Sequence, residues 1–484
     1  MTLESDVHYH IKNSFQSYID SWPNLLTLSR LLAKALRKKE ISLFSSYEFR
    51  DLSFSPALII PIILNNFKAL LITNKSQKSY LENFFKEILE SKYFSECLDN
   101  IDMQQRIRNI KIISTHELVS GLNINSNIFD LIIFTSAEDI IEELRIASTY
   151  KIISDDWDSL IKINPSKEKL IERTYDIINQ NIFYESLDKK NQILFNKESF
   201  SLIRNLAYLN TDNNHCKIWS EIKNLYLDDW LLWTNKLYMN NFTELFISPI
   251  DPFKQFRRLF IDRNIIFMIN DPNNDYLINE LRSNNLSINL NIKLIDNKNK
   301  SFNLFFPRKT LLPNTAKFVD NICYQCDRLV MFRNGWTLIL CDDVSILNKI
   351  FSYLKLKFDT KVIYESLPHS QTSIVCSSYR WWLNVSSNSY FPEQIIIALL
   401  PIPSIDIPVI KKKVEYLKLQ SKDWFRSYLL PKATLDLSRS IFSLRHNSGR
   451  LVILDGRIKS RKWARILLQK IKPWKMIKYV LPFD

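Results

Sequence analysis

The C-terminal part of the chain interleaves basic side chains with tryptophans, a pattern that suits binding of single-stranded nucleic acid. Lys and Arg neutralise phosphates, and an indole ring offers a face on which a base can stack. Residues 456–465 read GRIKSRKWAR. An exposed amphipathic helix whose Trp packs on its own domain would have the same pattern. The candidate nucleic-acid-binding residues are Lys422, Trp424, Arg457, Lys459, Arg461, Lys462, Trp463 and Arg465.

The charge of the chain is concentrated in the same region. The formal net charge is +14, and residues 411–480 hold 19 Lys and Arg against four Asp and Glu, which leaves the rest of the chain at −1. A localised basic face is what polyanion binding requires. Single-stranded DNA or another polyanion is therefore the expected partner. The alternative is a solvated face that only keeps the protein in solution.

Glycine is scarce, and its scarcity excludes two common nucleotide-binding motifs. The chain has four glycines, Gly121, Gly335, Gly449 and Gly456. A P-loop needs G-x-x-x-x-G-K-S/T, and a dinucleotide fingerprint needs three glycines within six residues. No spacing of these four glycines fits either motif. Nucleotide binding through a standard glycine loop is therefore not expected.

The cysteines do not predict a metal site. The six are scattered, which is typical of free thiols in a reducing compartment. Cys323 and Cys326 form one C-x-x-C pair, whose partners would have to come from Cys341, Cys376 or His369. No second C-x-x-C pair exists, so we expect buried thiols and no metal.

The hydrophobic pattern predicts an α/β protein. Short apolar runs at Phe67–Thr73, Ile110–Ser114 and Phe129–Phe134 alternate with helical patterns, which favours a parallel sheet. A second series of such strands begins at Thr337–Leu340 and includes Lys361–Tyr364, Ser373–Cys376, Gln394–Leu400 and Leu451–Asp455. Between the two series, the Trp-containing residues 155–245 look helical throughout.

These patterns divide the chain into two lobes. We expect residues 1–150 to form the N-terminal part of the first lobe, residues 151–245 a helical insertion, and residues 246–274 the return to the first lobe. Residues 275–312, rich in Asn, Lys and Ser, read as a linker. Residues 313–484 form the second lobe with its basic C-terminal segment.

Several landmarks in the second lobe resemble the DinG/XPD branch of superfamily 2 helicases. Residues 335–340, GWTLIL, are similar to that family's G-x-T-L-V-L strand, and residues 379–385, YRWWLNV, stand where it has F-W-E-G-V-D. Leu400–Pro403 and Leu430–Ala433 match its proline-containing turns, and LDGR at 454–457 matches its L-D-x-R. In the first lobe, residues 22–36 resemble its opening helix. The resemblance implies two RecA-like parallel-sheet lobes with an insertion in the first, and an ATP-dependent DNA helicase activity.

The same resemblance indicates that the nucleotide site is eroded. The phosphate loop should lie within residues 43–61, where Ser53 and Ser55 are the only hydroxyls near the expected register. At the D-E-A-H position stand Thr135, Ser136, Ala137 and Glu138, of which only Ala137 is retained. The family's glutamine position falls on Arg439 and its first arginine position on Ser443, with Arg445 two residues further on. The predicted vestigial nucleotide site comprises Ser53, Ser55, Thr135, Ser136, Glu138 and Arg445.

Catalysis of phosphoryl transfer needs the phosphate loop, a Mg²⁺-positioning carboxylate and an arginine finger together. ATP and Mg²⁺ are cofactors of the family, yet here we expect neither, and we expect no iron–sulfur cluster because only Cys97 lies where four cysteines are needed. The leading hypothesis is a helicase-like protein that retains at most nucleic-acid binding. The alternatives are a non-catalytic interaction or scaffold subunit with a protein partner, and an active helicase with an unconventional nucleotide site.

Two further patterns concern location. The N-terminus has no basic segment leading into an apolar run, so no secretory signal is expected. The longest apolar runs, Pro56–Leu64 and Ile395–Pro403, fall well short of the roughly 20 residues that span a bilayer. We therefore expect a soluble, cytoplasmic protein that does not associate with membranes.

Overall fold

The computed structural model describes residues 2–478 apart from 53, 91–105, 107, 121–127, 186–191, 210–216, 236–243, 261, 274, 295–299, 332–334 and 386–390. The chain divides into two compact units. The first comprises Met1–Asn66, Phe267–Ile402 and Phe425–Asp484, and the second comprises Phe67–Ile266 and Pro403–Trp424. Within the described ranges, no helix is both long enough and apolar enough to cross a bilayer.

The first of three sheets has six strands in the order β10-β1-β9-β4-β2-β3. The pairs β1–β10, β2–β4 and β2–β3 are parallel. Every residue of β1, β2, β4 and β9 is buried, which is typical of parallel strands covered on both faces. The strands are β1 (Ile41–Ser45), β2 (Ala69–Thr73), β3 (Ile110–Ser114), β4 (Leu131–Phe134), β9 (Asn264–Ile269) and β10 (Leu290–Lys293).

Helices follow these strands as the apolar spacing predicts. The segment 58–64, whose sequence suits either a helix or a buried strand, lies in α4 (Ser55–Leu64), which has Pro56 in its first turn, where a missing N–H costs nothing. The other helices of this region are α1 (Leu3–Ser14), α2 (Gln16–Ser21), α3 (Leu25–Leu36), α5 (Lys75–Glu90), α8 (Thr115–Ser120), α9 (Ile140–Ala147), α14 (Pro252–Gln255) and α15 (Tyr276–Ser283).

The second sheet is wholly parallel and has seven strands in the order β13-β14-β12-β15-β16-β11-β17. Five of its strands, β12 to β16, match the predicted apolar runs to within a few residues. The strands are β11 (Phe302–Phe305), β12 (Thr337–Leu340), β13 (Val362–Tyr364), β14 (Ile374–Ser377), β15 (Gln394–Ile397), β16 (Arg450–Ile453) and β17 (Trp474–Met476).

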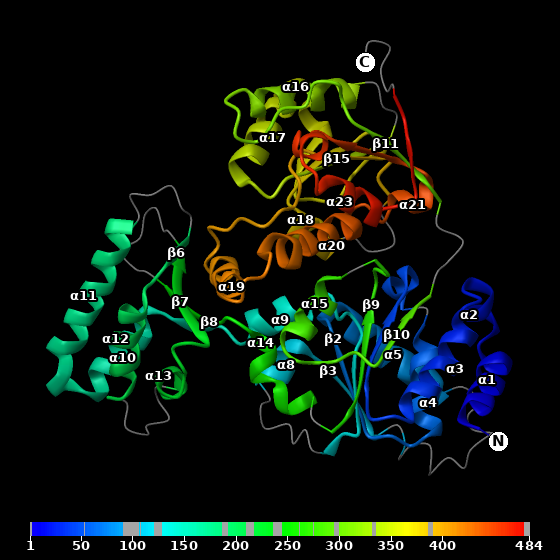
Figure 1. Cartoon of the computed structure of the whole chain (residues 1–484), viewed down its shortest axis with the longest axis horizontal. Helices are drawn as coiled ribbons and strands as arrows, with labels where there is room; N and C mark the ends of the chain where they lie inside the picture. Colours follow the sequence, from blue (N-terminus) through cyan, green and yellow to red (C-terminus); the bar gives the residue numbers. More distant parts are fainter. Residues whose placement is uncertain are drawn as a thin grey trace. The chain divides into compact units, whose positions relative to one another are not determined.

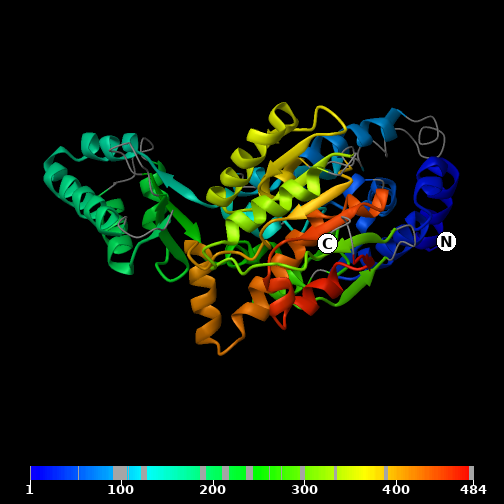
Figure 2. The ribbon, with the colours of Figure 1, turned by 90° about the horizontal axis from the view of Figure 1, so that it is seen from above.

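Helices cover both faces of this second sheet (Figures 1 and 2). Side chains of β12 alternate between two cores: Leu338 and Leu340 pack toward one and Ile339 toward the other. The first core includes α18 (Tyr379–Val385), α20 (Leu430–Ser440) and α23 (Ala464–Lys470). The second includes α16 (Phe318–Met331) and α17 (Val344–Phe358). This is the three-layer arrangement expected for a RecA-like lobe.

The insertion contains the expected helices together with a sheet that the sequence analysis did not predict. Its helices are α10 (Ser154–Ile163), α11 (Glu168–Glu185), α12 (Lys197–Ala207) and α13 (Lys217–Lys223). The antiparallel strands β5 (Tyr150–Ile152), β6 (Gln192–Leu194), β7 (Trp230–Asn235) and β8 (Leu245–Pro249) pair in the order β5-β8-β7-β6. Trp157 and Trp219 pack edge-to-face at 5.5 Å in the shared core. The insertion is therefore mixed α and β rather than helical throughout.

Residues 275–312, which read as a linker, hold three regular elements. α15 and β10 complete the first sheet region, and β11 belongs to the second sheet. The edge strand β10 alternates half-buried and exposed residues, so its polar composition reflects an edge position rather than a loop.

Candidate functional sites

The segment that follows β1 occupies the place where a RecA-like lobe carries its phosphate loop, and here it is filled by aromatic side chains. Residues 47–51 form a short 3₁₀ helix, η1 (Tyr47–Asp51), capped by the Ser46 hydroxyl, which accepts from the Glu48 N–H. Phe49 and Phe54 are fully buried, with ring centroids 5.0 Å apart. The chain's own side chains therefore pack inside this turn.

Of the two hydroxyls predicted in this segment, one can be placed. The Ser55 hydroxyl is fully buried and donates to the Leu52 carbonyl at 2.6 Å, so it completes the turn at the start of α4. Ser53 lies outside the described residues.

Arg445 lies against the same segment. Its side chain is 1% exposed, and its guanidinium carbon stands 4.2 Å from the centroid of the Tyr47 ring. Nη2 donates to the Ile471 carbonyl at 3.3 Å, while Nε and Nη1 are buried without a hydrogen-bond partner among the described residues. A stacked, enclosed cation of this kind is held by the ring face and by packing. No local sequence pattern predicts Tyr47 as its partner, because the two residues lie far apart in the chain.

The hydroxyls after β4 are also engaged within the chain. Thr135 and Ser136 both donate to Oε1 of Gln77, at 3.2 and 2.6 Å, and Thr73 at the end of β2 donates to the same oxygen at 3.2 Å. All four residues are buried. The amide oxygen of Gln77 thus joins the ends of β2 and β4. Glu138, two residues after Ser136, is also buried and is 4% exposed. Gln77, in the first turn of the helix after β2, was not predicted.

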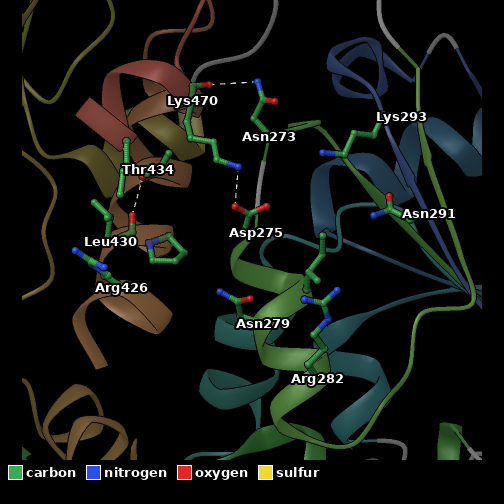
Figure 3. A pocket seen from close by; sticks show the side chains of 13 residues that line it. Asn273, Asp275, Asn279, Arg282, Asn291, Lys293, Arg426, Leu430, Thr434 and Lys470 are labelled. Atoms are coloured by element: carbon green, nitrogen blue, oxygen red, sulfur yellow. Dashed lines mark hydrogen bonds and ion pairs between the residues drawn. The ribbon is translucent and has the colours of Figure 1, made fainter. Parts of the chain in front are cut away.

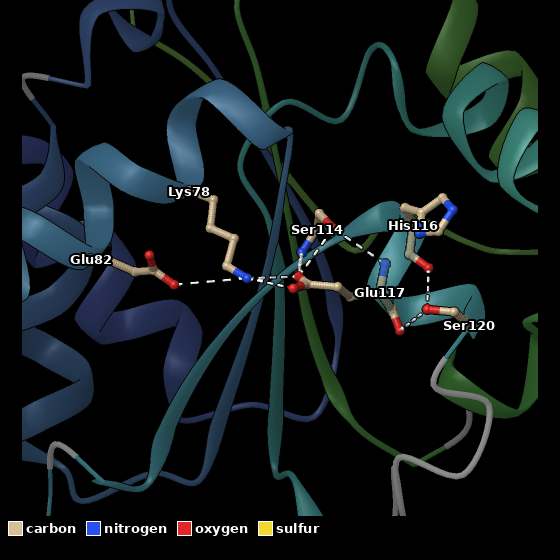
Figure 4. A network of polar contacts seen from close by, with 6 residues as sticks. All are labelled: Lys78, Glu82, Ser114, His116, Glu117 and Ser120. Atoms are coloured by element: carbon tan, nitrogen blue, oxygen red, sulfur yellow. Dashed lines mark hydrogen bonds and ion pairs between the residues drawn. The ribbon is translucent and has the colours of Figure 1, made fainter.

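A second polar network holds the end of β3 (Figure 4). The Glu117 carboxylate accepts from Lys78 Nζ at 2.6 and 2.8 Å and from the Ser114 N–H at 2.7 Å. These contacts, first of all the one with Lys78, lower the pKa of Glu117 to about 2. Because Glu117 lies on α8 and Ser114 ends β3, this network anchors α8 to β3.

The basic C-terminal residues separate into two groups. The Arg457 guanidinium pairs with the fully buried Asp455 carboxylate, and Lys459 Nζ donates to the Pro307 carbonyl at 2.6 Å. Arg461, Lys462 and Arg465, around α22 (Arg457–Ser460) and α23, are exposed, and no side-chain partner is described for any of them. These three residues are named the basic face below.

The tryptophans near these residues are partly covered by their own domain. The Trp463 ring packs on the second-lobe core and lies 5.5 Å from the Phe425 ring. Lys418 Nζ stands 5.5 Å from the Trp424 ring, and Lys422 is exposed. Trp382 is 1% exposed and donates to the Ser440 carbonyl, so it belongs to the core.

The four described cysteines lie in one core. Burial raises the pKa of Cys323 to about 11 and those of Cys341 and Cys376 to about 12, and it raises that of Cys326 as well. Thiols with raised pKa values are poor metal ligands, since metals bind the thiolate. Among the described residues, no group of three or more His, Cys, Asp or Glu is placed to hold a metal ion. Cys97 lies outside the described residues.

Comparison with solved structures identifies the architecture. Xpd4 of S. tokodaii matches 92% of this chain and 97% of its own, with a TM-score of 0.58 and 14% identity. The structure "XPD_APO" matches 93% of this chain and 100% of its own, with a TM-score of 0.61 and 11% identity. The structure "XPD_Helicase" matches 98% of this chain and 99% of its own, with a TM-score of 0.56 and 10% identity. The chain has the XPD helicase fold. No protein-family model and no curated protein matches the sequence.

The XPD-like fold confirms the two RecA-like lobes that the landmark residues implied. At identities of 10–14% the likeness concerns the fold, and the chemistry of this chain has to be argued from its own residues.

Proposed function

We propose that this chain is a helicase-fold protein that binds single-stranded nucleic acid and does not hydrolyse ATP. The observation that carries the binding half is the basic face, where Arg461, Lys462 and Arg465 project three unmatched charges from one lobe. Phosphates are the polyanion that such a face neutralises, and binding through them needs no nucleotide cycle.

The loss of hydrolysis is inferred from what fills the strand ends. Buried Phe49 and Phe54 pack where a glycine loop would leave its N–H groups open to phosphate. Thr135 and Ser136 cannot replace a Mg²⁺-binding carboxylate and a general base, and their hydroxyls are bonded to Gln77. The enclosed Arg445 stacks on Tyr47, so its charge is directed into the protein. Each lost part alone costs orders of magnitude in rate.

The binding half is tested by fluorescence anisotropy of a labelled oligothymidylate titrated with protein at several salt concentrations. The triple variant Arg461→Glu, Lys462→Glu, Arg465→Glu is compared with Lys169→Glu, an exposed lysine of the insertion. Removing three phosphate contacts should flatten the slope of log K against log salt by about 2, since each contributes roughly 0.7 for a single strand. Lys169→Glu should leave the slope unchanged.

Each outcome decides between the hypotheses. Salt-dependent binding that is the same with and without Mg·ATP supports the proposal. Absence of binding even at low salt would favour a scaffold subunit whose partner is another protein. A triple variant with an unchanged slope would show that a different surface holds the strand.

A further inference from the structure

The strongest feature outside these sites is a cavity of about 490 Å³ within the first compact unit (Figure 3). Its lining comes from the segment after β9, from α15 and β10, and from α20 and α23. No lining residue comes from the turn after β1 or from the end of β4. The cavity nevertheless adjoins the turn after β1, because its lining residue Asn273 donates to the Tyr47 hydroxyl at 3.3 Å. Its volume lies in the range of sites that bind small organic ligands.

One wall of the cavity is cationic. Arg282 at the end of α15 and Lys293 at the end of β10 both line it, and neither has a hydrogen bond or ion pair among the described residues. Asn291, two residues before Lys293 on the same strand and so on the same side of it, also lines the cavity. Its amide has no described partner either. Two unmatched cations beside a free amide form a wall that favours an anion.

Two of the remaining charged residues of the cavity pair with each other. Lys470 Nζ pairs with the Asp275 carboxylate at 2.6 Å, and the Lys470 carbonyl accepts from the Asn273 amide at 3.3 Å (Figure 3). Among the described lining residues, Asp275 is the only acidic one. Because its charge is already neutralised, it does not offset Arg282 and Lys293, and the cavity keeps a net positive potential.

The opposite wall is mostly apolar, although Arg426 also lies on it (Figure 3). Leu430 and Pro431 at the start of α20 and Ile466 on α23 line it, with the Thr434 hydroxyl bonded to its own helix. An inorganic anion would leave this wall in contact with water, whereas an organic group attached to the anion would cover it. The cavity thus pairs a cationic wall with an apolar wall across one space.

We propose that this cavity binds a small organic phosphate, about a mononucleotide in size, with its phosphate on Arg282 and Lys293 and its organic part against Ile466 and Leu430. Arg and Lys are the side chains that bind phosphate most strongly. The site is separate from the basic face and requires no hydrolysis. It would let a soluble metabolite bind the lobe without a glycine loop.

Isothermal titration calorimetry of the full chain with AMP and with inorganic pyrophosphate, at low salt and without Mg²⁺, tests the site. Arg282→Gln and Lys293→Gln should each weaken binding of both probes about tenfold, the loss of one charge-assisted hydrogen bond. Ile466→Asn should weaken the binding of AMP and leave the binding of pyrophosphate unchanged, because only AMP covers the apolar wall. Thermal melting of each variant confirms that it is folded.

Lys462→Gln on the basic face is the matched control. It should leave AMP binding unchanged and lower the affinity for the single strand. Arg282→Gln should lower the affinity for AMP and leave binding of the single strand unchanged. This proposal and the proposed function can therefore fail independently of each other. Two results would overturn the cavity assignment. One is wild-type protein that does not bind AMP at millimolar concentration. The other is AMP affinity that survives both Arg282→Gln and Lys293→Gln.

Discussion

The turn after β16 and the turns after β1 and β4 are held together in different ways. After β16, the buried Asp455 carboxylate accepts from the Leu400 N–H and pairs with the Arg457 guanidinium. After β1, the rings of Phe49 and Phe54 fill the turn, and after β4 the hydroxyls of Thr135 and Ser136 donate to the Gln77 amide oxygen. An ion pair therefore holds the first turn, whereas packing and neutral hydrogen bonds hold the other two.

Removing Asp455 should have the largest effect. Asp455→Ala leaves the Leu400 N–H without its acceptor and Arg457 without its counter-charge, and we expect a loss of about 3 kcal/mol. Urea unfolding measures the change. Asp406→Ala, at an exposed carboxylate, should stay within about 0.5 kcal/mol. If the two variants have the same free energy of unfolding, the contacts of Asp455 do not stabilise the fold.

Gly456→Ala tests the same turn by a steric route. The backbone of Gly456 has a φ of −63°, which any residue adopts, but an added Cβ would stand 2.5 Å from the Leu311 carbonyl oxygen. Forcing that backbone contact apart should cost about 2 kcal/mol, seen as a lower Tm. Gln469→Ala, at an exposed position of α23, is the control and should melt like the wild type.

In the first lobe, the corresponding test is Gln77→Ala. The change removes the one oxygen that accepts from Thr73, Thr135 and Ser136 in a buried space. We expect a loss of about 1.5 kcal/mol, because the three hydroxyls lose their shared acceptor. Lys86→Ala, exposed on the same helix α5, should have no measurable effect. An unchanged Gln77→Ala variant would mean that the hydroxyls do not close the strand ends.

The smallest effect concerns the network at β3. The pKa of Glu117, about 2 in the folded protein, lies below its ordinary value of 4.5, so its ionised form stabilises the fold above pH 4.5 and this contribution disappears as the pH falls toward 2. Since Glu117 is about half exposed, the contribution should stay below about 1 kcal/mol. The difference in unfolding free energy between wild type and Glu117→Gln should shrink between pH 5.5 and pH 3. A difference that is constant with pH would contradict the assignment.

The sequence predicted the elements with strong apolar runs and missed those without them. β2, β4, β9 and β12 are fully buried, so composition alone marks them. The strand β7, WLLWTN, joins an antiparallel sheet through partners elsewhere in the insertion, and its short pattern also suits a helix. The strands β10 and β11 are not predicted because they lie in a segment rich in Asn, Lys and Ser, which reads as a linker.

The candidate sites divide in the same way. Exposure of Arg461, Lys462 and Arg465 follows from their charge, since long cationic side chains are rarely buried, and it could be predicted. The stack of Arg445 on Tyr47 and the role of Gln77 depend on contacts between distant segments, which no local pattern carries. The cavity combines residues from α15, β10, α20 and α23 and was not predicted for the same reason.

Hydrolysis of ATP is the most direct test of the central claim, that the turns after β1 and β4 serve packing and not phosphoryl transfer. Release of phosphate from Mg·ATP is measured with the purified chain, with and without saturating oligothymidylate. We expect no release above the protein-free rate in either condition, although the strand is bound. Release that the strand stimulates and that Arg445→Ala abolishes would contradict it.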